Sequence, residues 1–223
     1  MPNSAPNLLL IPTDLERDRV RDLGGFEAAG EPLVQATCGF GVIAAAARTM
    51  QLIARHAPRR VLLMGIAGSF DEAEFEIGTA RAFGAVEIDG IGVGEGAGFR
   101  GPNRLGFSQW PGPGDGDAPP ALDEHLELAT GSGLLLTTCA ASDSPSQAAE
   151  RRGRHPDAIA EDMEGFAVAS ACRLARVPVA IVRGASNLVG VRDPKHWRIP
   201  LALSAARRLA IEFLERDDWG DAP

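Results

Sequence analysis

Short apolar runs alternate with helical or polar segments along this chain. Residues 8–11, 61–64 and 177–182 are nearly continuous apolar runs, each with the length of a strand that is buried on both faces. Between them, residues 42–56 and 165–175 carry small and apolar side chains at helical spacing. This alternation predicts a mainly parallel sheet with helices on both of its faces.

The remaining segments complete the same architecture. Further strands are expected at 32–37, 77–86 and 133–139, with 88–93 as a candidate continuation of the strand at 77–86. Further helices are expected at 13–23, 121–130, 144–153 and 201–216. Residues 94–120 are rich in Gly and Pro, and a loop of this length is usually functional, interfacial or mobile. We therefore expect a single domain over residues 1–223, an α/β three-layer sandwich with a mixed, mainly parallel central sheet.

Composition and charge narrow the range of partners. The chain has 223 residues, of which 45% are hydrophobic and 23% are charged, and its formal net charge is −8. This charge argues against binding to nucleic acid or to an acidic membrane surface. The N-terminal residues lack the basic segment of a signal peptide, and no apolar stretch has membrane-spanning length. We therefore expect a soluble, cytoplasmic protein.

The cysteines and histidines give no sign of a metal site. Cys38, Cys139 and Cys172 are isolated from one another and from any histidine at a metal-ligand spacing, so we expect core thiols of a reducing compartment. Surface positions are expected for the four histidines, which are His56, His125, His155 and His196. We expect neither a metal nor a cofactor.

Polar clusters follow the apolar runs at several places. They lie at residues 12–16, 65–69 and 184–187, and a further acidic cluster at 162–164 opens a helix. The carboxyl ends of parallel strands meet at one edge of a sheet, where ligands bind. Glu164 at the helix start and Asn187 just past a strand are therefore candidates to converge on one small molecule.

Each cluster also has a purely structural interpretation. Thr13 and Glu16 have the spacing of a capping box, which on spacing alone we favour over catalysis by roughly two to one. Glu164 would also suit a helix N-terminus, and Asn187 a turn. The glycine-rich turn at 65–68 matches neither a Walker loop nor a dinucleotide fingerprint. The residues alone leave these alternatives open.

Taken together, these motifs resemble the nucleoside phosphorylase and nucleosidase superfamily, which includes the methylthioadenosine/S-adenosylhomocysteine nucleosidases. The similar segments are 12–16, 38–41, 64–68, 77–79, 161–165 and 183–187. Within the superfamily, residues 186–203 are similar to the futalosine hydrolases of menaquinone biosynthesis. The resemblance implies a nucleoside phosphorylase-like fold and hydrolysis of an N-ribosidic bond, which for futalosine releases hypoxanthine and dehypoxanthine futalosine.

The resemblance also implies roles for individual residues. Glu16 would activate water, Glu164 would bind the ribose hydroxyls, and Asn187 would contact the base. Substrate-binding positions would be Met163 against the sugar, Ser186 beside the base, and Thr13, Ala67, Gly68 and Phe107 in the pocket. Phe107, like Phe99, is a candidate for stacking or for a partner-subunit lid, and a packing role is equally open. Because relatives associate, the resemblance also implies a homo-oligomer, in which the loop at 94–120 could complete a neighbouring site.

Asn187 differs from the adenine-specific members, which carry Asp at this place. An amide cannot act as a general acid at neutral pH, but it can donate to O6 or N7 of a purine while its oxygen accepts a proton held on N7. The substitution therefore favours a 6-oxopurine base, and with it futalosine over aminofutalosine or methylthioadenosine.

Three alternatives stay open. A purine nucleoside phosphorylase would use phosphate in place of water, with Arg17, Arg48 and Ser69 as candidate ligands. The chain could also be an adenine nucleosidase of the same superfamily, or a binding protein without catalysis, although the presence of both glutamates argues against the last. The carboxylate end of futalosine could contact Arg100, Arg104 or Arg192. The segment around Trp197 has the character of a packed loop.

Overall fold

The computed structural model describes residues 5–26, 32–112, 121–216 and 219. The strands in this part of the chain are β1 (Asn7–Ile11), β2 (Leu33–Thr37), β3 (Arg60–Ser69), β4 (Ala80–Ala82), β5 (Ala85–Asp89), β6 (His125–Glu127), β7 (Leu134–Thr138), β8 (Ala158–Asp162) and β9 (Val179–Leu188). The helices are α1 (Asp14–Asp22), α2 (Gly41–His56), α3 (Pro102–Leu105), α4 (Pro145–Arg154), α5 (Gly165–Ala175) and α6 (Ile199–Leu214), with short 3-10 turns η1 (Gly96–Gly98) and η2 (Pro194–His196).

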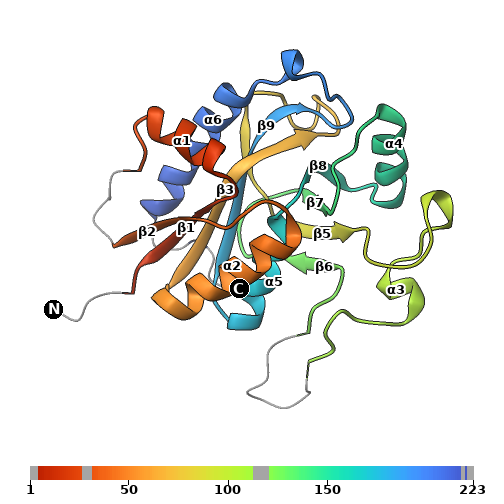
Figure 1. Cartoon of the computed structure of the whole chain (residues 1–223), viewed down its shortest axis with the longest axis horizontal. Helices are drawn as coiled ribbons and strands as arrows, with labels where there is room; N and C mark the ends of the chain where they lie inside the picture. The colour runs from red at the N-terminus through yellow and green to blue at the C-terminus, as the bar shows by residue number, and fades with distance from the viewer. Residues whose placement is uncertain (1–4, 27–31, 113–120, 217–218, 220–223) are drawn as a thin grey trace.

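Within these residues the strands form one nine-stranded mixed sheet (Figure 1). Its main path runs β2-β1-β3-β8-β7-β5-β6, while β9 pairs with β3 and β4. The pairs β1–β2, β1–β3, β3–β9, β5–β7 and β7–β8 are parallel, and the pairs β3–β8, β4–β9 and β5–β6 are antiparallel. The mainly parallel α/β sheet expected from the sequence is confirmed.

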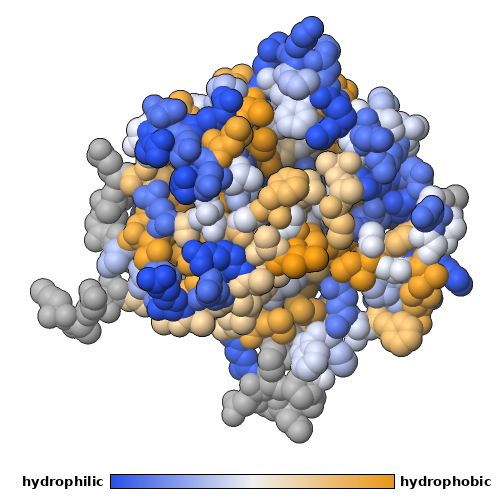
Figure 2. Space-filling model, in the orientation of Figure 1, coloured by the Kyte–Doolittle hydropathy of each residue, from blue (hydrophilic) through white to orange (hydrophobic). Residues whose placement is uncertain are grey.

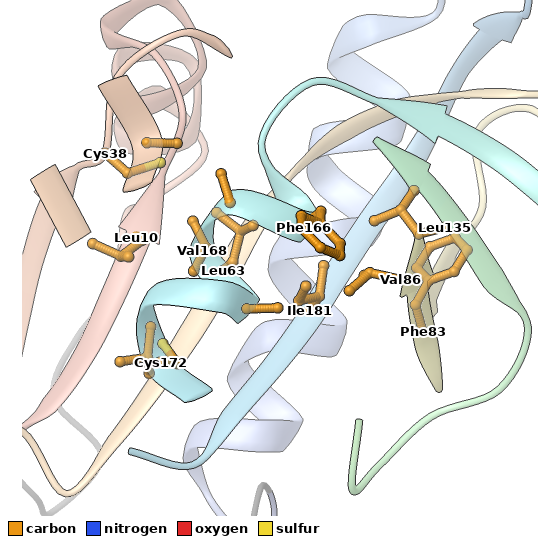
Figure 3. Close-up of a cluster of buried hydrophobic side chains, with 14 of the residues drawn as sticks. Leu10, Cys38, Leu63, Phe83, Val86, Leu135, Phe166, Val168, Cys172 and Ile181 are labelled. Carbon is orange, nitrogen blue, oxygen red and sulfur yellow. The ribbon is translucent and has the colours of Figure 1, made fainter. Parts of the chain in front are cut away.

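Side chains of successive strand residues point to opposite faces and build two cores. Leu10, Leu63 and Ile181 face α2 and α5, where they meet Phe166 and Cys172 (Figure 3). The intervening residues Leu9, Leu62 and Val182 face α6 and pack with Leu203 and Phe213. Both faces of the central strands are therefore buried, which explains why their sequences are nearly continuous apolar runs.

The surface above α2 is less polar than the rim of the molecule. Figure 2 shows hydrophobic side chains across the middle of this face and hydrophilic ones around its edge. Ile43 near the start of α2 is 83% exposed, and Phe40, the N-cap residue of this helix, is 67% exposed. Phe40 also lines the cavity described below.

Three expectations about the middle of the chain are wrong. The segment 121–130 contains strand β6, in which buried Leu126 alternates with the exposed residues on either side and pairs with β5. The strand expected over 77–86 is divided into β4, which pairs with β9, and β5, which pairs with β6 and β7. Strand β5 ends at Asp89 and does not continue to residue 93. The long loop at 94–120 contains η1 and α3, while its residues 113–120 lie outside the described part.

Two expectations about single residues also need correction. Cys38 and Cys172 are buried, as expected, but Cys139 is exposed. His155 is largely buried, and its ring nitrogens form hydrogen bonds with Glu87 and Asp89 at 2.6 and 3.2 Å. Burial would lower the pKa of His155, but these carboxylates outweigh it and raise the pKa to about 9.

The described helices are all too short or too polar to cross a membrane.

Close packing of α6 on the sheet depends on Gly184 in β9. A Cβ at this position would overlap the carbonyl oxygen of Ala202 and lie 2.6 Å from its carbonyl carbon. We expect Gly184→Ala to lower the free energy of unfolding by about 3 kcal/mol, because backbone atoms of α6 must move. Urea unfolding followed by circular dichroism measures this change.

Gly153→Ala is the matched control. Gly153 lies within α4 and has no atom within 4 Å of its ideal Cβ position. The same substitution there should leave stability unchanged or raise it by about 0.5–1 kcal/mol, because alanine favours a helix over glycine. Equal stability of the two variants would contradict the packing argument.

Candidate active site

A cavity of about 280 Å³ lies where the carboxyl ends of β1, β3 and β9 meet the start of α5. Its walls bring together almost all of the site residues expected from the sequence, namely Thr13, Glu16, Ala67, Gly68, Met163, Glu164, Ser186 and Asn187. Phe107 does not line this cavity; it follows α3 and is 69% exposed. The convergence follows from the sheet, since these residues come from the ends of β3 and β9 or from the loops and helix starts that follow β1 and β8.

Glu16 takes part in helix capping and lines the cavity at the same time. Thr13 donates to its Oε2 from both the backbone N–H, at 3.2 Å, and the hydroxyl, at 2.7 Å. The Ile66 N–H donates to Oε1 at 3.0 Å. Burial raises the pKa of Glu16, although the Thr13 hydrogen bond and the charge of Arg183 oppose this. The capping box that we weighed against catalysis is therefore present, and it fixes the carboxylate in the cavity wall.

Glu164 occupies the N-cap position of α5 but does not cap that helix with its side chain. Its Oε1 accepts from the N–H of Gly41 at 3.0 Å, so the carboxylate links α5 to the start of α2. Asp162 caps the start of α5 instead, because its Oδ2 accepts a hydrogen bond from the N–H of Gly165 at 2.8 Å. Burial raises the pKa of Glu164 to about 7; Arg183 opposes the rise and Asp162 adds to it.

Arg183 is the site residue that the sequence analysis missed. Its side chain is fully buried within β9, and its Nη2 lies 2.6 Å from Asp162 Oδ2 and 3.5 Å from Glu164 Oε2. Burial alone would lower the pKa of Arg183, but attraction to Asp162, Glu164 and Glu16 raises it. This single guanidinium therefore offsets the charge of carboxylates from α1, β8 and the start of α5. The one feature of the sequence that could have indicated this residue is its position directly after the apolar run at 177–182.

Gly65 makes room for this arrangement. An ideal Cβ at Gly65 would overlap Nη1 of Arg183 and lie 2.8 Å from Glu16 Oε1. Within the described part of the chain, Nη1 has no hydrogen-bond partner. A donor of the guanidinium and an oxygen of the general-base candidate thus face the same small space above Gly65.

The amide of Asn187 has one orientation that satisfies its neighbours. Its Nδ2 donates to the carbonyl oxygen of Leu188 at 2.8 Å, and a flipped amide would place two acceptors together. The Ser186 hydroxyl therefore donates to Asn187 Oδ1 at 2.8 Å. One N–H of the amide and one lone pair of its oxygen are left to face the cavity.

The loop after β7 forms the wall beside Asn187 and is held by a buried ion pair. Ser142 donates to Glu161 from its N–H and from its hydroxyl, both at 2.7 Å. Arg151 of α4 lies 3.0 Å from Glu161 Oε2 and donates to the Ala140 carbonyl at 2.7 Å. Because these hydrogen bonds and the ion pair hold the loop, the rest of the fold determines the shape of this wall.

The candidate phosphate ligands do not gather at the cavity. Arg17 forms an ion pair with Asp14 at 2.7 Å, Arg48 contacts Gln51 on the surface of α2, and the hydroxyl of buried Ser69 donates to the carbonyl of Asp71 at 3.0 Å. None of the three lines the cavity. Among the described residues, no group of three or more His, Cys, Asp or Glu side chains could hold a metal ion.

Comparison with known proteins gives one family. The model of the Phosphorylase superfamily matches residues 16–215. The futalosine hydrolase of Thermus thermophilus is 30% identical over 240 residues, covering 97% of this chain and 98% of the relative. The futalosine hydrolase of Streptomyces coelicolor is 38% identical over 148 residues, which cover 65% of this chain and 60% of the relative. A 5'-methylthioadenosine/S-adenosylhomocysteine nucleosidase of Psychromonas ingrahamii is 27% identical, covering 84% and 83%.

Solved structures share the fold. The 5'-methylthioadenosine/S-adenosylhomocysteine nucleosidase of Colwellia psychrerythraea, solved with adenine, has a TM-score of 0.75 at 19% identity, covering 95% of each chain. The futalosine hydrolase of Helicobacter pylori has a TM-score of 0.62 at 15% identity, covering 94% of this chain and 91% of that one.

The raised pKa of Glu164 predicts a pH-dependent stability. The folded state holds this proton above the ordinary pKa of 4.5, so the unfolded chain releases it first as the pH rises. Glu164 therefore contributes less stability as the pH increases from about 4.5 to about 7. We expect the stability of the wild type relative to Glu164→Gln to fall by roughly 3 kcal/mol over this window, as measured by urea unfolding at a series of pH values.

Glu72→Gln removes an exposed carboxylate and serves as the control. Its free energy of unfolding should differ from that of the wild type by the same amount at every pH of the series. A pH-independent difference between the wild type and Glu164→Gln would contradict the assignment.

Proposed function

Because this chain belongs to the phosphorylase superfamily, we propose that it hydrolyses the N-ribosidic bond of a 6-oxopurine nucleoside and that its substrate is futalosine. The chain is an N-ribosyl hydrolase, in keeping with relatives named futalosine hydrolase and 5'-methylthioadenosine/S-adenosylhomocysteine nucleosidase. The choice among substrates is our inference. The observation that carries it is the oriented amide of Asn187 in the same cavity as Glu16 and Glu164.

Cleavage of an N-ribosidic bond passes through an oxocarbenium-like sugar and needs a water nucleophile. Glu16 suits the role of general base, since its carboxylate is fixed by Thr13 and Ile66 and its raised pKa strengthens it as a proton acceptor. The attacking water would reach Glu16 from the cavity, which this residue lines. Arg183 lies outside the cavity lining, so its guanidinium would act on Glu16 through its charge while Glu16 accepts the proton of the water.

Glu164 suits the sugar end of the reaction. Its Oε1 accepts from Gly41 and its Oε2 is the more weakly held, 3.5 Å from Arg183, so it can accept hydrogen bonds from ribose hydroxyls. Negative charge beside the sugar also favours the developing oxocarbenium ion. Arg183 has a second function here, because its charge keeps the buried Glu164 closer to ionisation than burial alone would allow.

The base end of the cavity supports a 6-oxopurine. Asn187 offers an N–H that can donate to O6 or N7, and its oxygen can accept a proton held on N7. Hypoxanthine, as the more acidic leaving group, departs without the proton donor that adenine needs. Its release would leave dehypoxanthine futalosine, so the proposal includes a role in menaquinone biosynthesis. It also includes a cytoplasmic location and a homo-oligomeric state.

A second candidate is an adenine nucleosidase acting on methylthioadenosine, S-adenosylhomocysteine or aminofutalosine. The fold similarity to adenine-bound nucleosidase structures favours it, whereas the amide at position 187 does not. Purified protein incubated with futalosine, aminofutalosine, methylthioadenosine and inosine decides between the two when free base is measured. Faster adenine than hypoxanthine release would replace our proposal. Ribose 1-phosphate formed only with added phosphate would reject hydrolysis.

Glu16→Gln tests the general base. The amide oxygen can still accept from Ile66, but the group can no longer take a proton from water. We expect kcat to fall by about 10²- to 10⁴-fold with little change in nucleoside binding. Glu212→Gln, at an exposed position on α6, is the control and should keep full activity. Wild-type turnover by Glu16→Gln would remove Glu16 from the mechanism.

Asn187→Asp tests whether Asn187 determines which purine base the enzyme releases. The Leu188 carbonyl oxygen requires a donor at this position, so the new carboxyl group should hold a proton and be able to protonate adenine. We expect the ratio of adenine to hypoxanthine release to rise by at least about tenfold, measured with aminofutalosine and futalosine. Asn103→Asp, on exposed α3, should leave the ratio unchanged. An unchanged ratio in Asn187→Asp would refute this role.

A further inference from the structure

A second hollow of about 440 Å³ adjoins the active-site cavity, and we call it the outer hollow. Its lining residues are Arg19, Arg192, Pro194, Trp197, Ile199 and Pro200. Arg192, Trp197 and Ile199 also line the active-site cavity. The two spaces therefore share a wall, and a substituent that leaves the cavity on this side enters the outer hollow.

The loop that builds the outer hollow is tied to the base-binding strand. The N–H of Arg198 donates to the carbonyl oxygen of Ser186 at 2.7 Å, next to Asn187. The indole N–H of Trp197 donates to the carbonyl oxygen of Val191 at 3.0 Å, which fixes the ring. The position of the outer hollow relative to the active site is therefore set by direct hydrogen bonds.

Two guanidinium groups face the outer hollow from different elements. Arg19 lies one helical turn after Glu16 on α1, and the guanidinium carbon of Arg192 lies 4.9 Å from the ring centroid of Trp197. Within the described residues neither arginine forms an ion pair. The neighbouring Asp193 is engaged in its own turn, where it accepts from the N–H of Lys195 at 3.0 Å. The outer hollow is thus locally cationic in a chain whose net charge is −8.

The remaining walls are apolar. Pro194, Trp197, Ile199 and Pro200 offer flat or aliphatic surfaces, and the stacking of Arg192 on Trp197 keeps a cation at their border. An apolar surface next to guanidinium groups is complementary to a flat ring that carries a carboxylate. A bare inorganic anion would make no use of the apolar walls.

We propose that the outer hollow binds an aromatic carboxylate attached to the sugar of the nucleoside, with Arg192 and Arg19 as partners of the carboxylate and Trp197 as the wall for the ring. This inference rests on the proposed function and adds to it the residues that select the substrate. Nucleosides with a short neutral sugar substituent do not reach the outer hollow, so the arginines distinguish the acid from such substrates. Arginine suits this role because its planar donors match a carboxylate.

The test compares a ligand with and without the negative charge. Dehypoxanthine futalosine and its methyl ester differ only at the carboxylate, and their binding to the wild type and to variants is measured by calorimetry without turnover. We expect the wild type to bind the acid roughly 5- to 30-fold more tightly than the ester, in the range of a partly exposed charge-assisted contact. Arg192→Gln and Arg19→Gln should each reduce this ratio, and the double variant should bring it to about one.

Matched controls remove the same charge outside the outer hollow. Lys195→Gln lies in the same loop as Arg192, and Arg21→Gln lies on the same helix as Arg19. Both should keep the wild-type ratio of acid to ester. Equal binding of acid and ester by the wild type would overturn the proposal, as would an equal effect of Lys195→Gln and Arg192→Gln.

Measuring base release as well as binding makes failure of this proposal distinguishable from failure of the proposed function. Failure of the wild type to release base from futalosine refutes the proposed function. Equal binding of acid and ester by the wild type, or an unchanged ratio in the Arg19 and Arg192 variants, refutes the role of the arginines.

Discussion

The structure depends on the buried guanidinium of Arg183. It lies in β9 at the centre of the fold, and it meets carboxylates that arrive from α1, β8 and the start of α5. Removing one partner of a buried ion pair typically costs about 3–5 kcal/mol, because the remaining charge is left without compensation. Arg183 therefore joins residues that are far apart in sequence, and without it neither the fold nor the cavity would tolerate Glu16 and Glu164 together.

This arrangement is not neutral when every group is ionised, and burial is the main cause of the raised pKa values of Glu16 and Glu164. Glu16, Asp162 and Glu164 share the single guanidinium among the described residues at this point. The pKa values of Glu16 and Glu164 both rise, as is common for carboxylates in a functional site, and that of Glu164 reaches about 7. A better balanced cluster would be more stable and less reactive, so stability and chemistry impose opposite demands on the same residues.

The sequence predicted which residues of the candidate site would meet in the cavity where they lie at the boundary between an apolar run and a polar loop. Glu164 and Asn187 could be found this way because strand ends converge in a parallel sheet. Arg183 was missed because an arginine after an apolar run looks like the end of a strand, whereas β9 continues to Leu188. His155 was missed because its partner Asp89 is distant in sequence, and such contacts leave no local signal.

The capping box at Thr13 has a consequence for motion. The side chain of Glu16 closes the first turn of α1 and also lines the cavity, so it cannot rotate away without breaking its hydrogen bonds from Thr13 and Ile66. Its conformational entropy is therefore lost during folding, before any substrate arrives. The helix terminus therefore holds the proposed proton acceptor in place before substrate binds, and under this proposal fraying of this one turn would abolish activity while the rest of the protein stayed folded.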